Sequence, residues 1–237
     1  MNSQKVAIIT AASRGIGAGC ARELFSRGYR VSLIARNKSV FELASELGGI
    51  ATQGSIANPQ DLQQLVETTL LNFGRVDAVV NSFGDPPRPD LLSISDEMWI
   101  ENFQMLFLSV VRMARLVTPP MQQQGGGAIV NISACDSQEP GLGTPFSGTL
   151  RAAMEGFTKL YAKRYKADRI RMISVAPFFV ADSMEELEGW NVPIDLMFGR
   201  PATYAEFAKT VAFLISDDAK FITGTTLKVD EARSAAI

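Results

Sequence analysis

Short apolar runs of the kind that form buried strands alternate with amphipathic segments along almost the whole chain. The expected strands are Val6–Thr10, Val31–Ala35, Ile50–Thr52, Asp77–Asn81, Ala128–Ile132, Arg171–Val175 and Thr226–Val229. The expected helices lie between them, at Gly17–Gly28, Val40–Leu47, Pro59–Phe73, Asp96–Gln123, Phe146–Lys166 and Ala205–Ser216. Strands that alternate with helices form mostly parallel sheets covered on both faces. The sequence therefore predicts an α/β fold, a doubly wound Rossmann-type parallel sheet with helices on both faces.

No linker, repeat or low-complexity stretch divides the 237 residues, so we expect a single domain over residues 1–237. In a doubly wound sheet, ligands bind at the carboxyl ends of the strands, near the point where the strand order reverses. The loops that follow Thr10, Ala35, Asn81, Ile132 and Val175 should therefore line one site.

The composition excludes several kinds of site and partner. The chain has no histidine, which rules out a Ser-His-Asp or Cys-His triad and any histidine-ligated metal. Its two cysteines, Cys20 and Cys135, do not form a disulfide framework, and we expect no metal site. A net charge of −2 gives no broad attraction to nucleic acid or to an anionic membrane. Because the sequence shows neither a signal-peptide pattern nor a membrane-spanning run, we expect a cytoplasmic protein.

A glycine-rich loop joins the first expected strand to the first expected helix. It reads Thr10-Ala-Ala-Ser-Arg-Gly-Ile-Gly17. Glycines allow the backbone to approach a pyrophosphate, and the helix N-terminus adds N–H donors and the positive end of the helix dipole. The loop therefore favours a dinucleotide site, although a plain strand-to-helix turn can have the same sequence.

Further motifs follow this loop in a fixed order. They are Asn81-Ser-Phe-Gly84, Ile129-Val-Asn-Ile-Ser133, Ala176-Pro177, Gly199-Arg-Pro201 and Ile222-Thr-Gly-Thr-Thr-Leu-Lys-Val-Asp230. With the glycine loop, they resemble the short-chain dehydrogenase/reductase family, and in particular its 3-oxoacyl-ACP-reductase-like members. The family pattern T-G-x-x-x-G-x-G has Ala11 at its first glycine here. The resemblance implies a nicotinamide dinucleotide held by Thr10, Ser13, Arg14, Gly15, Ile16, Gly17, Arg36, Asn81, Gly84 and Pro177.

The segment after the second expected strand bears on which dinucleotide is bound. An acid at this place favours NAD, whereas arginine accommodates the 2′-phosphate of NADP. Here the segment is Ala35-Arg36-Asn37, without an acid, and Arg14 lies within reach of the same place. Two guanidinium groups suit a dianionic phosphate, so we expect NADP(H). The alternative is that both arginines are solvated surface residues.

The resemblance ends at the catalytic positions. The family uses an Asn, a Ser, a Tyr and a Lys, and these positions align with Leu106, Ala134, Ser147 and Arg151. A serine hydroxyl is a far weaker acid than a phenol, and arginine stays protonated and cannot relay a proton. The remaining candidates for chemistry are Ser147, Arg151, Ser133 and Cys135, with a buried inert thiol as the alternative for Cys135. Ser147 and Arg151, four residues apart, could clamp a carboxylate or phosphate; alternatively, Arg151 could pair with a nearby acid or hold the cofactor's phosphate.

Two functions remain open from the sequence. One is an atypical oxidoreductase-like protein that binds NADP(H) and acts on a small hydrophobic substrate without the Ser-Tyr-Lys mechanism. This interpretation uses the apolar residues Trp190, Leu196, Met197 and Phe198 in the segment expected to cover the substrate. The other is a catalytically inactive pseudoenzyme that serves as a ligand-binding or structural subunit. An apolar stripe along the long helix predicts a homodimer or homotetramer; it contains Phe103, Phe107, Val110, Val111 and Ala114.

Overall fold

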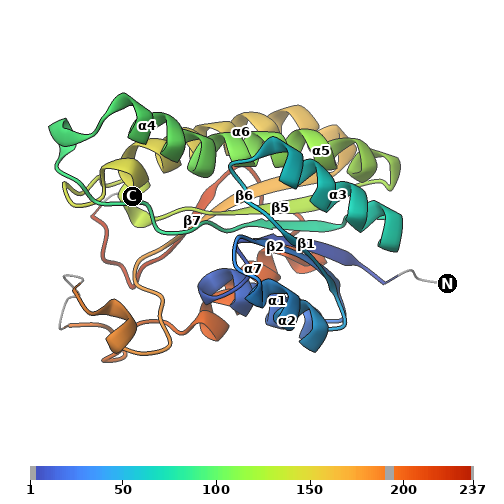
Figure 1. Ribbon diagram of the computed structural model, residues 1–237, viewed down its shortest axis with the longest axis horizontal. Helices are drawn as coiled ribbons and strands as arrows, with labels where there is room; N and C mark the ends of the chain where they lie inside the picture. The colour runs from blue at the N-terminus through green and yellow to red at the C-terminus, as the bar shows by residue number, and fades with distance from the viewer. Residues whose placement is uncertain (1–3, 190–194, 236–237) are drawn as a thin grey trace.

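One parallel sheet of seven strands forms the centre of the computed structural model, which describes residues 4–189 and 195–235 (Figure 1). The strands lie in the order β3-β2-β1-β4-β5-β6-β7. Their bounds are β1 Val6–Thr10, β2 Arg30–Ala35, β3 Ile50–Gln53, β4 Ala78–Asn81, β5 Gly127–Ile132, β6 Ile170–Pro177 and β7 Thr226–Val229. The order reverses between β1 and β4, which confirms the predicted doubly wound sheet and brings the loops after these two strands together.

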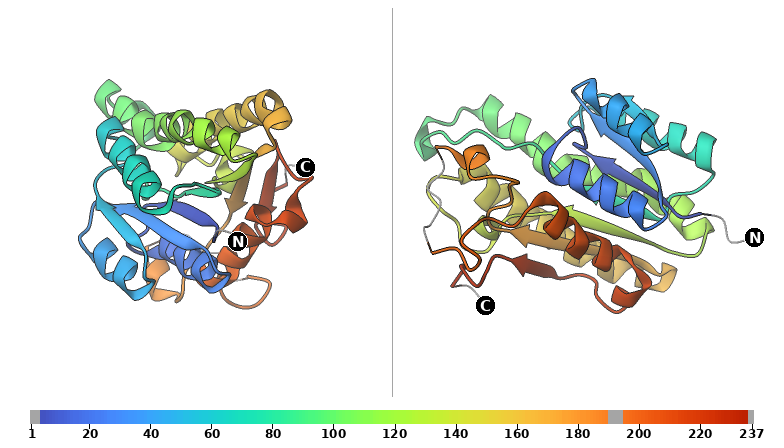
Figure 2. Two further views of the ribbon diagram at one scale, coloured as in Figure 1. Left: turned by 90° about the vertical axis from the view of Figure 1, so that its right-hand side faces the viewer. Right: turned by 90° about the horizontal axis from the view of Figure 1, so that it is seen from below.

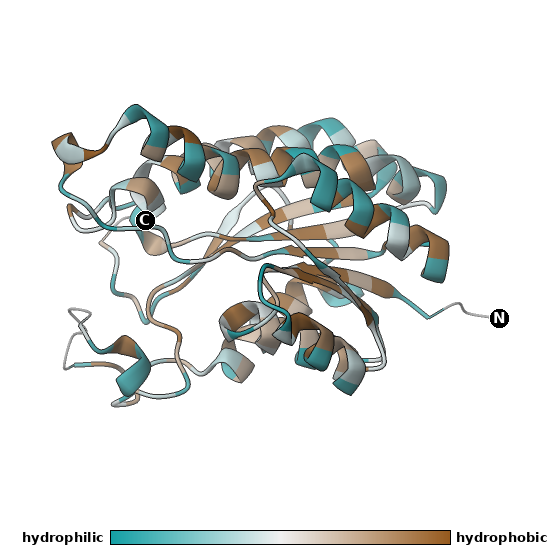
Figure 3. Ribbon diagram, in the orientation of Figure 1, coloured by the Kyte–Doolittle hydropathy of each residue, from teal (hydrophilic) through white to brown (hydrophobic). Residues whose placement is uncertain are grey.

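Helices cover both faces of the sheet (Figure 1 and Figure 2). One face carries α3 (Pro59–Phe73), α4 (Asp96–Phe103), α5 (Ser109–Gln123) and α6 (Ala152–Tyr165), and the other carries α1 (Gly15–Ser26), α2 (Ser39–Glu46) and α7 (Tyr204–Ile215). Successive strand residues point to opposite faces, so Ile8 packs in the apolar cluster under α3 and α5 whereas Ile9 packs in the cluster under α1 and α7. The strands are therefore apolar on both sides and the helices on one side only (Figure 3).

Local signals fix several helix ends. Pro59 is the first residue of α3, the Asn58 side chain accepts a hydrogen bond from the Gln60 N–H at 3.0 Å, and Gly74 ends the helix in the left-handed conformation. A capping box between Thr203 and Glu206 begins α7. Among the described helices, none combines the length and apolar character needed to cross a bilayer.

Two predicted helices are interrupted. The expected helix from 96 to 123 is divided by a π-helical turn, Gln104–Leu108, and the expected helix from 146 to 166 begins with another, Ser147–Arg151. The two turns contact each other. A π turn inserts one extra residue into a helix and is frequent at functional sites. Here the turns contain Leu106, Ser147 and Arg151, three of the four positions expected to align with the family's catalytic residues.

Candidate functional site at the carboxyl edge of the sheet

The glycine loop leaves β1 in a conformation that only small residues tolerate. Gly15 has φ +60°, and Ala11 has φ +48°, which is strained for a residue with a side chain. A Cβ on Gly17 would lie 2.5 Å from the Ala11 carbonyl oxygen, so glycine is required there. Arg14 occupies the N-cap of α1 without a hydrogen bond from its side chain to the helix. The Arg14 side chain therefore does not cap the first N–H groups of α1. A helix N-terminus that binds phosphate needs such uncapped N–H groups.

Two of the predicted cofactor residues hold strand ends together. The Thr10 hydroxyl donates to the Ser82 carbonyl oxygen at 2.7 Å and accepts from the Ser82 N–H at 2.9 Å, which joins the ends of β1 and β4. Asn81 donates to the Asn131 side chain at 2.8 Å. These two residues therefore shape the edge of the sheet on which a dinucleotide would lie.

The Asn81 contact belongs to a buried polar ladder. Asn131 donates in turn to the Thr158 hydroxyl of α6 at 3.0 Å, and Thr158 shares a hydrogen bond of 3.0 Å with Ser174 of β6. All four residues are at most 3% exposed. Because each polar group has a partner, the ladder satisfies its buried atoms while connecting three strands to α6.

Arg14 and Arg36 both lie exposed at the same edge. Arg36 follows β2, and its Nη2 comes within 3.9 Å of the place where a Cβ on Gly84 would stand, so its side chain extends across β1 toward the end of β4. Within residues 4–189 and 195–235, neither guanidinium forms an ion pair with a carboxylate. This pair of uncompensated cations is the arrangement that the NADP(H) hypothesis requires.

Tyr204, which the sequence did not single out, lies beside the glycine loop. A Cβ on Gly15 would be 3.7 Å from its ring, and its hydroxyl donates to Glu186 Oε2 at 2.5 Å. Burial and then Glu186 raise the pKa of Tyr204. Asp182 accepts a hydrogen bond from the Tyr204 N–H at 3.1 Å. The segment after β6 is thus fastened to the start of α7 next to the loop, through contacts that no sequence spacing indicates.

The four positions expected to correspond to the family's catalytic residues lie after β5, in the π turn before α6 and in the π turn before α5. Leu106 is fully buried and packs with Phe146 and Leu150, and Ser147 is 7% exposed. Ala134 is the second residue after β5 and presents only a methyl group. These described positions carry a leucine, an alanine, a serine and an arginine, and none of these side chains has the acidity of a phenol.

Arg151 is a buried cation held by main-chain oxygens. It is 7% exposed, and its Nη1 donates to the Ile132 carbonyl oxygen and, at 3.1 Å, to that of Ser133. Its guanidinium also lies 5.3 Å from the centre of the Phe83 ring. Burial lowers the pKa of Arg151 to about 10, which leaves it charged at neutral pH. Its Nε is sealed from solvent without a hydrogen-bond partner among the described residues.

The side chains of Ser133 and Cys135 both donate hydrogen bonds to neighbouring protein groups. Ser133 Oγ donates to Glu155 Oε1 at 2.5 Å, and Ser137 Oγ donates to the same oxygen at 2.5 Å. The Cys135 thiol donates to the Ala176 carbonyl oxygen at 3.5 Å. Burial first and Asp230 second raise the pKa of Cys135 to about 12, so a nucleophilic thiolate is disfavoured at neutral pH. The geometry supports the inert thiol rather than a catalytic one.

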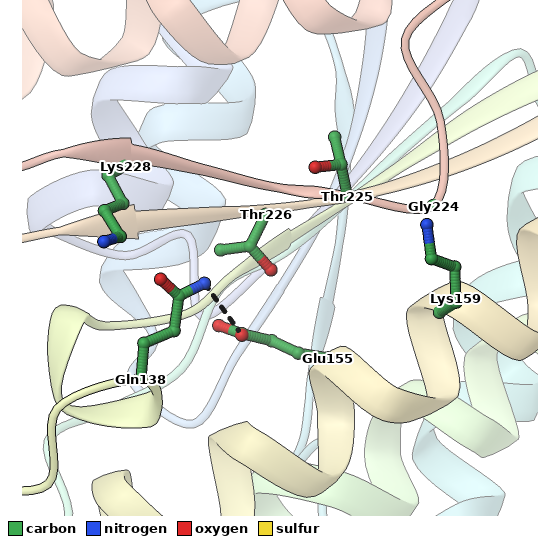
Figure 4. A pocket seen from close by; sticks show the side chains of 7 residues that line it. All are labelled: Gln138, Glu155, Lys159, Gly224, Thr225, Thr226 and Lys228. Atoms are coloured by element: carbon green, nitrogen blue, oxygen red, sulfur yellow. Dashed lines mark hydrogen bonds between the residues drawn. The ribbon is translucent and has the colours of Figure 1, made fainter. Parts of the chain in front are cut away.

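Glu155 also lines a hollow between α6 and β7 with a volume of about 670 Å³ (Figure 4). Its Oε2 accepts a hydrogen bond from the Gln138 amide at 3.4 Å. Lys159 of α6 and Lys228 of β7 lie on opposite sides of the labelled lining residues in Figure 4. No sequence spacing indicates this acid, because its serine partners come from the loop after β5. In the part of the chain that is described, no three acidic or cysteine side chains gather as a metal site would require.

Pro177 ends β6, and the Phe178 N–H donates to the Val229 carbonyl oxygen at 3.2 Å. The Phe178 and Phe179 rings meet edge to face at 4.4 Å. Two aromatic side chains thus directly follow the strand. Of the apolar residues expected to cover a substrate, Met197 and Phe198 are exposed, and Trp190 lies outside the described residues.

Comparison with known proteins agrees with this architecture. Residues 10–231 match the family model described as enoyl-(acyl carrier protein) reductase. The chain is 32% identical to the 3-oxoacyl-[acyl-carrier-protein] reductase of Haemophilus influenzae, over 95% of this chain and 96% of that protein. It is 31% identical to dehydrogenase/reductase SDR family member 4 of Caenorhabditis elegans, over 93% of this chain and 91% of that protein.

Solved structures give the same result. L-Sorbose reductase from Gluconobacter frateurii, complexed with NADPH and L-sorbose, superimposes with a TM-score of 0.89 at 26% identity, over 99% of this chain and 98% of that one. Acetoin dehydrogenase from Enterobacter cloacae gives a TM-score of 0.90 at 26% identity, over 100% and 98%. The sheet order, the glycine loop and these matches over nearly the full length lead to one conclusion: the chain belongs to the short-chain dehydrogenase/reductase family.

Proposed function

We propose that this protein binds NADP(H) at the carboxyl edge of its sheet and acts there on a small, largely apolar substrate, without a Ser-Tyr-Lys proton relay. The observation that carries the cofactor is the pair Arg14 and Arg36, two exposed guanidinium groups without a carboxylate partner among the described residues. The glycine loop and the uncapped start of α1 support the pyrophosphate position. The NADPH in the related L-sorbose reductase is consistent with this cofactor.

When bound, the nicotinamide would supply hydride chemistry. The residues that would hold the dinucleotide are the main chain of Ser13, Gly15, Ile16 and Gly17 and the side chains of Arg14 and Arg36. The Arg151 cation at the end of β5 would stabilise developing negative charge on a bound oxygen but would keep its own proton. Any proton delivered to that oxygen must therefore come from solvent or from the substrate itself.

Calorimetric titration with NADPH and NADH tests the cofactor. We expect NADPH to bind at least tenfold more tightly than NADH, and Arg36→Ala to remove most of this difference, because one charge-assisted contact contributes about 1.5–3 kcal/mol. Lys163→Gln, which removes an exposed cation on α6, is the matched control and should leave the ratio unchanged. Equal affinities in the unchanged protein would contradict the assignment.

The second candidate is a binding or structural subunit without turnover. It is favoured by the engagement of Arg151 with main-chain oxygens and by the raised pKa of Cys135, which leave these two described residues neither a proton relay nor a thiolate nucleophile. Turnover of NADPH over a panel of small ketones separates the two. The variant with Asn at 106, Ser at 134, Tyr at 147 and Lys at 151 restores the family residues and serves as the positive control. Activity in the variant alone favours the subunit, and activity in both favours the enzyme.

We further propose that the chain assembles as a homodimer or homotetramer through the α4–α5 and α6 face. Ile100, Phe103 and Leu160 are exposed there, at 57%, 37% and 68%. Sedimentation velocity tests this, and a monomer at micromolar concentration would contradict it.

A further inference from the structure

The buried guanidinium of Arg151 lacks a counterion. None of the described carboxylates lies within 4.0 Å of it, although Asp85, Asp136 and Glu155 are near enough to act on its charge. A buried charge without a paired partner is costly in a folded protein. The two carbonyl contacts reduce this cost but do not neutralise the charge. An anion bound at this place would therefore be stabilised.

Three donors at this place have no partner among the described residues, and two of them are open to a ligand. Among the described residues, Arg151 Nε is the one side-chain polar atom that is both sealed and without a partner. Arg151 Nη2 and the Ser147 hydroxyl also make no hydrogen bond to a described residue, so neither can be sealed. The two residues are four positions apart on one π-helical turn and share a face of it. The turn thus presents a guanidinium N–H and a hydroxyl together.

The surroundings of this pair are apolar. Phe83 lies against the guanidinium, and Leu106, Phe146 and Leu150 form a cluster on the same turn and the facing one. Low local polarity strengthens a charge-assisted hydrogen bond and also accepts a hydrocarbon body. A ligand that fits these neighbours carries an anionic head and an apolar remainder.

The nearby acids decide between a carboxylate and a phosphate. Asp85, Asp136 and Glu155 act on Arg151 from more than 4.0 Å away, so their carboxylates lie around the site rather than on the guanidinium. A dianionic phosphate would be repelled by these acids more strongly than a monoanion would be. The charge balance therefore favours a monocarboxylate.

We propose that Arg151 and Ser147 bind the carboxylate of a small monocarboxylate with an apolar body, which makes such acids the ligand class of this site. The placement of this ligand beside a nicotinamide rests on the proposed function, but the binding itself does not. Arg151 supplies the charge and one N–H, and Ser147 supplies a second donor. The pair would then recognise the carboxylate of the ligand at the place where the family has a proton relay.

Ligand-observed NMR titration tests the proposal with hexanoate and benzoate, and with hexanamide and benzamide as neutral analogues of the same shape. We expect each acid to bind at least tenfold more tightly than its amide, to apoprotein and to NADPH-saturated protein alike. Ser147→Ala should weaken the acids severalfold and leave the amides unchanged. Arg151→Gln should abolish the preference for the acid, and Lys163→Gln should preserve it, which separates a local contact from general charge.

Several outcomes would overturn the proposal. One is equal binding of acid and amide; another is a Ser147→Ala variant with full affinity for the acid. Acid binding to apoprotein that disappears with saturating NADPH would also overturn it, since Arg151 would then serve the cofactor. If NADPH does not bind but the acid preference is present, the cofactor proposal fails and this one stands. Circular dichroism identifies an Arg151→Gln variant that does not fold, in which case the Ser147→Ala result decides.

Discussion

The strained backbone at Ala11 allows a sharp test of how the glycine loop is built. Its φ of +48° places an alanine in the left-handed region, which costs an L-residue about 1–2 kcal/mol. Ala11→Gly removes this strain, while the greater freedom of glycine in the unfolded chain costs about 0.4–1 kcal/mol. We therefore expect the variant to gain about 0.5 kcal/mol in the free energy of unfolding.

The neighbouring residue is the matched control. Ala12 is fully buried and is not in the positive-φ region. Ala12→Gly incurs the same unfolded-state cost and also loses a buried methyl group worth about 0.8 kcal/mol, so it should destabilise by about 1.5 kcal/mol. The two identical substitutions in adjacent positions should therefore differ in sign and by about 2 kcal/mol.

Urea unfolding followed by tryptophan fluorescence measures both variants. The midpoints should move in opposite directions while the slope stays constant. If Ala11→Gly destabilises as much as Ala12→Gly, the conformation assigned to the loop is wrong, and the argument for a strained phosphate-binding turn fails with it.

Three further predictions concern α6 and the buried titratable groups. Gly156→Ala should stabilise the protein by about 0.5–1 kcal/mol in thermal unfolding, because Gly156 is exposed within α6 and an added Cβ meets nothing within 4 Å; a loss of stability would mean that this face is covered. Burial raises the pKa of both Cys20 and Cys135 to about 12, so only about one thiol in 10⁴ is ionised at pH 8, and mass spectrometry should find neither alkylated by iodoacetamide until the protein unfolds; rapid native labelling of Cys135 would contradict its assigned environment. Burial also raises the pKa of Tyr161 to about 12, above its unfolded value of about 10, so this group's contribution to stability is complete below pH 10 and is lost as the pH rises toward 12. Tyr161→Phe should reduce this alkaline loss in the free energy of unfolding, measured as a function of pH. The Thr118 hydroxyl keeps its hydrogen bond to the Ala114 carbonyl oxygen in the variant. An unchanged alkaline slope of the free energy of unfolding would show that Tyr161 is not its source.

The fold followed from the sequence because its signals are local. Apolar runs, Pro59 and Gly74 fix strands and helix ends within a few residues, and the glycine loop marks the edge where strands β1 and β4 meet. The hydrophobic pattern does not predict the π turns, because one extra residue in a helix changes too little of the pattern in a short segment. The sequence therefore predicts regular helices at 96–123 and 146–166.

The side-chain environment of the site could not be predicted in the same way. The burial of Arg151 depends on carbonyl groups of β5, and the partners of Glu155 come from the loop after that strand. Tyr204 contacts Gly15 although 189 positions separate them in sequence. These contacts arise from packing between distant elements, and sequence spacing carries no information on which polar group meets which.

The polar ladder at the end of the sheet has a consequence for how the chain reaches its native alignment. Strands that are apolar on both sides can slide past each other without exposing hydrocarbon, so hydrophobicity alone discriminates weakly against misregistration. In this ladder Asn81, Asn131 and Ser174 are direct partners across β4, β5 and β6. A shift of one residue would separate the side chains of Asn81 and Asn131. Buried polar atoms would then lack hydrogen-bond partners, at a cost of about 1–3 kcal/mol each. Only the correctly aligned sheet satisfies these buried hydrogen bonds, so the ladder favours the native strand register.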